Sequence, residues 1–170
     1  MNGVATSPSP LWMKVVFGRN PKRTLVRLIC LVTLTLVVFR FVLIPIRVSG
    51  LSMYPTYTDG KVSVVNHLAY QWSKPRRGDV IAFRQPEDVV LLKRIVGLPG
   101  ERVRIKQGRV SINGQILDEP YAKIKSQSTL PTTRSEITLD KDEYYVIGDN
   151  RGITVFLTIQ GRSILGKVLF

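Results

Sequence analysis

The chain has very little of the side-chain chemistry that builds disulfides and metal sites. Its 170 residues include one cysteine, Cys30, and one histidine, His67. A single cysteine forms no intrachain disulfide, so cysteine usage assigns no redox compartment. One cysteine and one histidine also fall short of a Cys/His zinc site. We therefore expect no metal, and the lack of a P-loop or dinucleotide glycine pattern predicts no cofactor.

Acidic side chains are scarce, and the first third of the chain has none. Lysine and arginine number 25 against 12 aspartates and glutamates, which gives a net charge of +13, and the first acidic residue is Asp59. Basic residues that precede an apolar run predict a cytoplasmic N-terminus under the positive-inside rule. A basic chain can also bind nucleic acid. No recognition helix or aromatic-basic sheet signature is present, so we expect no nucleic-acid partner.

One long apolar run extends from Leu25 to Ile44. As a helix, its ~20 residues span ~30 Å, which is about the thickness of a bilayer core. Arg27 and Arg40 interrupt the run near its two ends, where long basic side chains snorkel to the interface. Pro45 is expected to end the helix. The run therefore predicts a single-pass anchor in the cytoplasmic membrane, with the lipid bilayer as a partner.

Three segments follow from this interpretation: a basic cytoplasmic tail over 1–23, an anchor over 24–45, and a domain over 46–170 on the outer, periplasmic face. Two other interpretations of the apolar run stay open. A basic leader, a short apolar segment and the small residues of Val48-Ser49-Gly50 also fit a cleaved signal peptide. A buried core helix fits less well, because the run is apolar all round rather than along one stripe.

Beyond the anchor the hydrophobic pattern becomes strand-like. Segments rich in valine and isoleucine are bounded by glycine, proline, asparagine and aspartate, which is typical of strands and turns. Asn113-Gly114 predicts a tight hairpin, and Lys123–Glu136 is a polar segment expected to form an exposed loop. The pattern favours a mainly β domain, with a curled antiparallel sheet or barrel-like assembly. The candidate strands are Lys61–Leu68, Asp79–Arg84, Val89–Val96, Arg102–Lys106, Arg109–Ile112, Gln115–Leu117, Ile137–Leu139, Tyr144–Ile147 and Ile164–Leu169.

Ser52 lies just beyond the apolar run, in Gly50-Leu51-Ser52-Met53-Tyr54-Pro55-Thr56. A serine needs a base to become a nucleophile, and His67 is the only histidine available. Lys93 lies within the apolar segment Val89–Val96, where burial lowers the pKa of an amine and frees its lone pair. The two residues are therefore a candidate Ser-Lys hydrolase pair. A turn serine and an edge-strand lysine are the ordinary alternatives.

Four segments, in this order, resemble the bacterial type I signal peptidase family, and the resemblance covers residues 45–170. They are the segment around Ser52, Arg77–Phe83, Leu92–Glu101 and Gly148–Arg151. The family consists of membrane-anchored serine endopeptidases that remove signal peptides from exported preproteins. The resemblance implies that Ser52 is the nucleophile and Lys93 the general base of an acyl-enzyme mechanism. It implies signal-peptide-bearing preproteins as partners.

The resemblance also implies how a substrate is held. An extended substrate would pair beside the strand that reaches Gly50 and Leu51, adding to a sheet edge. Met53 and Leu92 are candidate walls of small pockets because they adjoin the catalytic pair. The Ser52 backbone N–H is the first candidate oxyanion donor. Some family members place a hydroxyl where Gly50 stands, so that side-chain donor is absent here.

The last family segment is altered in this chain. Asp149 and Arg151 are expected to support the site, although Gly-Asp-Asn is also an ordinary turn. Thr154 occupies the offset of a family serine, and the following Asp-Ser-Arg stretch is missing. Two other functions therefore stay open. One is a divergent non-catalytic or accessory paralogue, and the other is a dedicated Ser-Lys maturation peptidase of a secretion or conjugation system.

Overall fold

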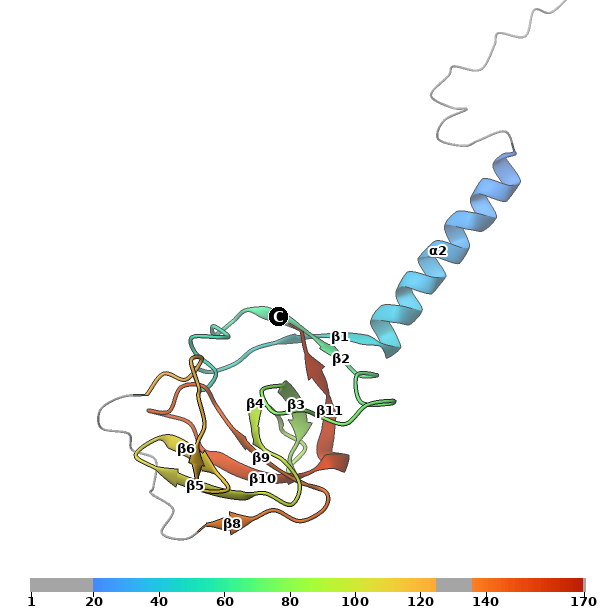
Figure 1. Ribbon diagram of the computed structural model, residues 1–170. Coiled ribbons are helices and arrows are strands. Elements are labelled where there is room, and N and C mark those ends of the chain that lie inside the picture. Colours follow the sequence, from blue (N-terminus) through green and yellow to red (C-terminus); the bar gives the residue numbers. More distant parts are fainter. Residues whose placement is uncertain (1–19, 125–135, 170) are drawn as a thin grey trace, which may run out of the picture. The chain divides into compact units, whose positions relative to one another are not determined.

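The computed structural model describes residues 20–124 and 136–169 (Figure 1). The chain divides into two units, one ending at Arg40 and one beginning at Phe41, and each is described by itself. Most of the expected cytoplasmic tail, residues 1–19, lies outside the described residues. So do residues 125–135, which make up most of the segment expected to be a polar loop.

The first unit contains one helix, α2 (Pro21–Phe41). Its apolar side chains are exposed all round, and the 20 residues from Lys22 are long and apolar enough to cross a membrane. Proline is well suited to the first helical position, because its missing N–H has no partner there. The helix ends at Phe41 and not at Pro45, so the expected boundary was wrong by four residues. Residues 43 and 44 of the apolar run belong to a strand instead.

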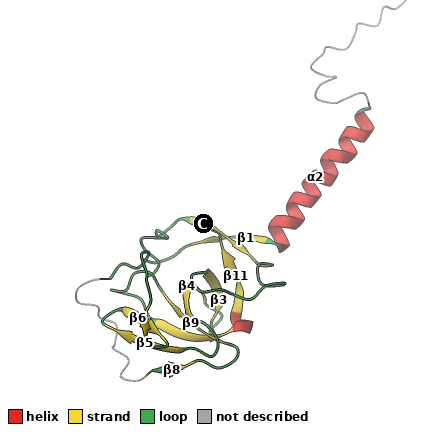
Figure 2. Cartoon of the chain, viewed as in Figure 1, coloured by secondary structure: helices red, strands yellow, loops and turns green. Residues whose placement is uncertain are grey.

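The second unit is built from antiparallel strands in two sheets (Figure 2). The seven-stranded sheet has the order β1 (Leu43–Arg47), β2 (Val62–Asn66), β11 (Ile164–Val168), β3 (Val80–Arg84), β4 (Val90–Gly97), β9 (Glu143–Ile147) and β10 (Phe156–Gln160). The four-stranded sheet has the order β7 (Gln115–Ile116), β6 (Arg109–Ile112), β5 (Arg102–Lys106) and β8 (Ile137–Thr138). A short 3-10 turn, η1 (Gly161–Ser163), precedes β11.

The expected mainly β fold class with antiparallel strands is confirmed, and the larger sheet does not close on itself. Within the described residues β1 and β10 are the edges of the larger sheet, so no closed barrel forms. The hairpin at Asn113-Gly114 is also confirmed. Asn113 has a φ of 52° and Gly114 a φ of 85°, and Ile112 pairs with Gln115 across this two-residue turn. Left-handed φ at both central positions matches the twist of the flanking strands.

Two strands were not expected from the sequence. β1 contains Pro45, which cannot donate to a ladder, and the strand tolerates it because it is an edge strand. β10 lies in the altered segment after Arg151 and pairs with β9, with Phe156 opposite Ile147 and Gln160 opposite Glu143. The altered segment therefore contributes β10 as an edge strand of the larger sheet.

The core consists of three apolar clusters, and one of them lies beside Ser52. This cluster includes Met53, which is 1% exposed, together with Val48, Tyr57, Val65, Val80, Ala82 and Val168. Burial of Met53 fixes the residue that follows Ser52, so the core positions the segment that carries Ser52. A second cluster joins the smaller sheet to β4 and β9, and a third packs around Ile81 and Val146.

β4 runs very close to its neighbours at Gly97, next to a register shift in its pairing with β9. A Cβ atom at Gly97 would lie 2.7 Å from Val103 Cγ2 and 2.8 Å from Tyr145 Cβ. We expect Gly97→Ala to destabilise the protein by roughly 1–3 kcal/mol, because neither neighbour can move without disturbing the core. Denaturant unfolding in detergent micelles measures this loss.

Gly100→Ala is the matched control, because Gly100 has a φ of +80° but nothing within 4 Å of an added Cβ. It should cost about 1 kcal/mol from backbone strain alone. A Gly97→Ala variant that is no less stable than Gly100→Ala would show that the close approach is not tight.

Candidate active site

Ser52 and Lys93, the two residues expected to form the catalytic pair, lie in direct contact. Lys93 projects from β4, where its backbone pairs with Ile81 of β3, and only 4% of it is exposed. Its Nζ lies 2.7 Å from Ser52 Oγ, within hydrogen-bond distance. The protonated amine donates this bond, whereas the neutral amine accepts it from the hydroxyl. The contact therefore allows a proton to pass from Ser52 to Lys93.

The environment of Lys93 favours its neutral form. Burial lowers the pKa of the amine from 10.5 to about 8, and the negative charge of Asp149 opposes part of this shift. Burial acts in this direction because an ammonium loses its hydration in the protein interior. A substantial fraction of the amine is therefore unprotonated in mildly basic solution, which is the state that a general base requires.

Backbone contacts hold the nucleophile segment on both sides of Ser52. The Asn150 N–H donates to the Ser52 carbonyl at 3.0 Å, and the Asn150 side-chain amide donates to the Leu51 carbonyl at 3.1 Å. On the other side, Asp59 accepts a 2.8 Å hydrogen bond from the Gly50 N–H, and Gly50 has a φ of +91°. Sequence reasoning assigned no role to Asn150 or Asp59, although Asn150 lies within one of the four family-like segments.

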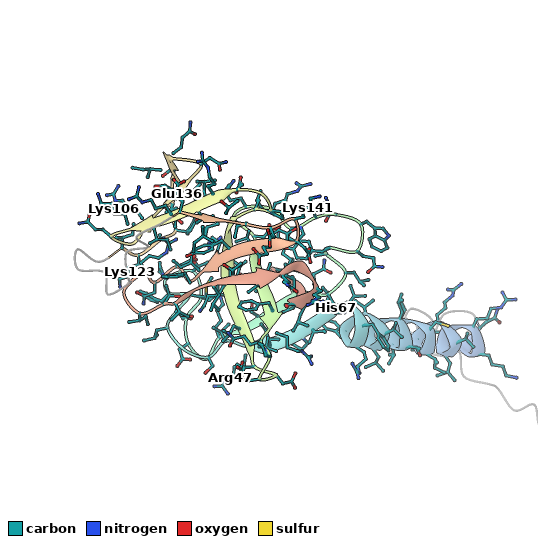
Figure 3. The ribbon with its side chains drawn as sticks, turned by 90° about the horizontal axis from the view of Figure 1, so that it is seen from below. Arg47, His67, Lys106, Lys123, Glu136 and Lys141 are labelled. Atoms are coloured by element: carbon teal, nitrogen blue, oxygen red, sulfur yellow. The ribbon has the colours of Figure 1, made fainter. Side chains whose placement is uncertain are left out.

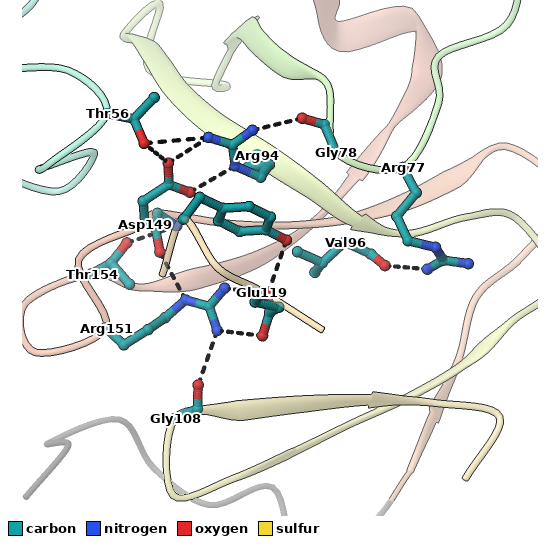
Figure 4. A network of polar contacts seen from close by, with 12 residues as sticks. Thr56, Arg77, Gly78, Arg94, Val96, Gly108, Glu119, Asp149, Arg151 and Thr154 are labelled. Atoms are coloured by element: carbon teal, nitrogen blue, oxygen red, sulfur yellow. Dashed lines mark hydrogen bonds and ion pairs between the residues drawn. The ribbon is translucent and has the colours of Figure 1, made fainter. Parts of the chain in front are cut away.

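Asp149 is completely buried and is tied to an arginine (Figure 4). Arg94 donates two hydrogen bonds to its carboxylate, at 2.8 and 2.6 Å, and the Thr56 hydroxyl donates a third. Only 11% of the Arg94 side chain is exposed, although Arg94 neighbours the buried Lys93 on the same strand. Its guanidinium also lies 4.0 Å from the centre of the Tyr121 ring.

Arg151 is also completely buried, and its partner was not expected. Its guanidinium forms an ion pair with Glu119, whose side chain is 4% exposed. The same guanidinium donates to the Gly148 carbonyl at 3.0 Å and to the Gly108 carbonyl at 2.9 Å (Figure 4). These bonds connect the segment after β9 to the turn between β5 and β6. Thirty-two residues separate the two charges, so no local pattern could have paired them.

The Thr154 hydroxyl supports the loop rather than the lysine. It accepts a 3.0 Å hydrogen bond from the Gly148 N–H and donates to the Val155 carbonyl at 3.2 Å. Among the described residues, no hydrogen bond joins Thr154 to Lys93. A Cβ atom at Gly148 would lie 2.3 Å from both the Ser52 carbonyl oxygen and the Thr154 Oγ1. Gly148 thus lets the loop that carries Thr154 lie directly against the backbone of Ser52.

The residues expected to contact substrate differ in their surroundings. Leu92 lines a mainly apolar cavity of about 490 Å³, whereas Met53 is buried in the cluster beside Ser52 and does not line that cavity. Leu51 is 54% exposed, next to Gly50, at the end of the segment that continues from edge strand β1. The other apolar residues of the cavity wall are Ile44, Ile46, Val65, Ala82, Val90 and Leu165.

Residues 20–124 and 136–169 contain no group of three or more His, Cys, Asp or Glu side chains that could hold a metal ion. At the site itself, the Lys93 amine and the Ser52 hydroxyl can move a proton, and the backbone N–H groups around Ser52 can bind an anion. This set suits acyl transfer through a covalent serine intermediate.

Comparison with known proteins identifies a serine endopeptidase. Residues 22–153 match the family described as signal peptidase, peptidase S26. The chain belongs to this family, whose reaction is the removal of signal peptides. Together with the apolar helix α2, family membership indicates a membrane-anchored protein.

Similar proteins include two bacterial signal peptidases. The chain is 34% identical over 130 residues to signal peptidase I V from Bacillus subtilis, which covers 71% of this chain and 77% of the relative. It is 30% identical over 152 residues to signal peptidase IB from Staphylococcus aureus, which covers 79% and 80%. A crystal structure of a signal peptidase I from Enterococcus faecalis is 31% identical, with a TM-score of 0.46 over 56% of this chain and 97% of the other.

The buried amine of Lys93 lowers the stability of the fold at neutral pH. Its folded-state pKa of about 8 lies below the ordinary value of 10.5. We expect Lys93→Met to raise the free energy of unfolding by roughly 1–3 kcal/mol at pH 7, because the variant buries no charge. The gain should be complete below pH 8, decline as pH rises toward 10.5, and vanish above it, where the amine is neutral in both states.

Unfolding of the full chain in detergent micelles at pH 7 and pH 11 measures this difference. Lys61→Met, at an exposed lysine, is the control and should change stability little at either pH. Equal gains for Lys93→Met at both pH values would mean that the amine is not held at a lowered pKa.

Proposed function

We propose that this chain cuts signal peptides from exported preproteins with Ser52 as nucleophile and Lys93 as general base. The observation that carries the proposal is the 2.7 Å contact between Lys93 Nζ and Ser52 Oγ. It is supported by the burial of the amine and by its pKa of about 8. A lysine held this way can act where most serine peptidases use histidine.

The reaction would proceed in two stages. The neutral amine of Lys93 takes the proton of Ser52 as Oγ attacks the scissile carbonyl carbon. The resulting ammonium then gives this proton to the leaving amine, and an acyl-enzyme remains on Ser52. In the second stage Lys93 takes a proton from a water molecule, which attacks the ester carbonyl carbon. The ammonium then returns this proton to Ser52 Oγ as the ester C–O bond breaks and the signal peptide leaves. Each stage begins with the amine neutral and ends with it neutral again.

The oxyanion of each tetrahedral intermediate needs a donor that is already in place. The Ser52 backbone N–H is the best placed, since the Asn150 contacts to the Leu51 and Ser52 carbonyls fix the orientation of this peptide segment. The Gly50 N–H is not available, because it donates to Asp59. The Ser52 N–H is therefore already oriented when negative charge develops on the carbonyl oxygen of the substrate.

The substrate would bind in extended form at the free edge beside β1, with its backbone aligned toward Gly50 and Leu51. The apolar cavity that Leu92 lines would receive side chains that precede the cleaved bond. In the bilayer, the basic N-terminal segment places the N-terminus on the cytoplasmic side and the β unit on the outer face. Exported preproteins reach this face with their signal peptides still in the membrane.

Replacing either member of the catalytic pair should abolish cleavage. We expect Ser52→Ala and Lys93→Ala to lower kcat/KM by ~10³-fold or more, since each removes an obligatory participant. The assay is cleavage of labelled preproteins by the full chain in lipid vesicles. Ser163→Ala, in η1, and Lys61→Ala are matched controls that should retain activity.

The same assay separates the alternatives. Wild-type protein that is as inactive as Ser52→Ala on every preprotein would favour an accessory role. Cleavage of one preprotein among several unrelated ones would instead favour a dedicated maturation peptidase.

The charge on Asp149 should set the pH range of activity. For wild type, kcat/KM should rise with pH through about 8, as Lys93 loses its proton. Because Asp149 raises the pKa of Lys93, Asp149→Asn should move this rise to lower pH. Glu119→Gln is the matched control, since it disturbs the other buried ion pair. An equal displacement of both profiles would show that loss of packing, and not charge, moves the pKa.

A further inference from the structure

Trp72 is the most exposed of the large apolar side chains that the structure describes, at 84%. It lies between β2 and β3, in residues 67–77, which we call the Trp72 loop. Tryptophan combines a large apolar surface with one N–H donor, and it is enriched where one side of a surface is apolar and the other is wet. Its position in open solvent therefore points to a partner that covers it.

Hydrogen bonds within the loop hold Trp72 outward. The Gln71 N–H donates to the Leu68 carbonyl at 3.1 Å, and the Ser73 hydroxyl donates to the Ala69 carbonyl at 2.8 Å. Both bonds close turns on either side of the tryptophan. The Tyr70 hydroxyl donates to Asp79, the residue before β3, at 3.0 Å and so holds the loop to the start of that strand. The exposed indole is thus presented by a fixed turn, with its backbone already ordered.

The charged side chains of the Trp72 loop itself are all basic. No acidic residue occurs from His67 to Gly78. Arg77 pairs with Glu101, but Lys74 and Arg76 are exposed and have no ion pair among the described residues. An aromatic side chain beside free cations is the combination that binds anionic lipid surfaces.

The loop also forms one wall of a cavity of about 750 Å³. Lys74 lines it from the loop, and Lys141 and Asp142 line it from the turn before β9. His67 of the loop and Lys141 of that turn, both labelled in Figure 3, line the cavity. Two lysines against one carboxylate leave the cavity basic, which agrees with the charge of the loop.

The start of the loop is tied to the residue that follows the anchor helix. The His67 N–H donates to the Val42 carbonyl at 2.9 Å, and Val42 directly follows Phe41, the last residue of α2. His67 Nδ1 also contacts the Leu165 carbonyl at 2.6 Å, which fixes the loop to β11. A helix that leaves the bilayer at Phe41 holds Val42, and with it His67, beside the lipid headgroups. Five residues of chain from His67 to Trp72 reach at most ~17 Å.

We propose that the Trp72 loop docks on the surface of the bilayer in which the chain is anchored. Trp72 enters the interfacial layer, and Lys74 and Arg76 contact the phosphates of anionic phospholipids. The β unit is then held to the membrane at two places, at α2 and at the loop. This proposal rests on the membrane anchor and is independent of the catalytic roles of Ser52 and Lys93.

Fluorescence of Trp72 in the full chain tests the proposal. The Trp12→Phe variant leaves Trp72 as the only tryptophan. It is reconstituted in vesicles of phosphatidylcholine with phosphatidylglycerol, and in vesicles of phosphatidylcholine alone. We expect blue-shifted emission, loss of most acrylamide quenching, and quenching by lipids with brominated acyl chains in the anionic vesicles. The control carries Trp12→Phe, Trp72→Phe and Ile116→Trp, which places tryptophan at a 68% exposed position in β7 and should remain open to acrylamide.

A charge-reversal pair tests the role of the cations. Lys74→Glu with Arg76→Glu should remove the difference between anionic and neutral vesicles, and Lys106→Glu with Arg109→Glu, of equal charge change in the smaller sheet, should preserve it. Acrylamide quenching of Trp72 in anionic vesicles as strong as in the Ile116→Trp control would overturn the proposal. Equal shielding of Trp72 from acrylamide in anionic and neutral vesicles would also overturn it. Shielding that increases with the density of protein in the vesicles would overturn it too, because the partner would then be a second copy of the chain. Cleavage activity is not a readout here, so failure of the catalytic proposal is separately visible.

Discussion

Burial of an amine next to a serine hydroxyl is the constraint on which the site depends. Lys93 must be desolvated for its pKa to fall, yet Asp149 lies near enough to oppose that fall. A carboxylate free to pair with Lys93 would keep it protonated and useless as a base. Arg94 prevents this, because it occupies both carboxylate oxygens of Asp149. The Arg94–Asp149 pair therefore helps to keep the Lys93 amine in its neutral form without a hydrogen bond to it.

Contacts from one short segment hold the backbone at Ser52 in place. The segment from Gly148 to Thr154 joins three separate parts of the fold. Asn150 binds the backbone at Ser52, Arg151 reaches Glu119 and the Gly108 turn, and Thr154 closes the segment on Gly148. Through its bond to the Gly108 carbonyl, Arg151 attaches the smaller sheet to the segment that contacts the backbone at Ser52. The missing Asp-Ser-Arg stretch leaves these contacts intact, since all of them arise from residues before it.

The sequence contained enough information for most strands and for the Ser52–Lys93 pair. Runs of valine and isoleucine identified strands because alternation is a local property, and the single histidine made lysine the alternative base. β1 was missed because Leu43 and Ile44 continue the apolar run, and only pairing with β2 decides their conformation. The partners of Arg94 and Arg151 were missed for the same kind of reason. Strand alternation predicts the face of the sheet to which a side chain points, but not which carboxylate from a distant part of the chain lies there.

The short junction between α2 and β1 limits how far Ser52 can lie from the end of the helix. One residue, Val42, separates the helix from the strand, and Ser52 follows Phe41 by eleven residues. Even a fully extended chain of that length reaches only ~40 Å. As the proposed nucleophile, the Ser52 hydroxyl would therefore act within ~40 Å of the end of α2, whatever the orientation of the β unit. Under the proposed mechanism, a polypeptide that has moved beyond this distance would escape cleavage, even when it carries a suitable sequence.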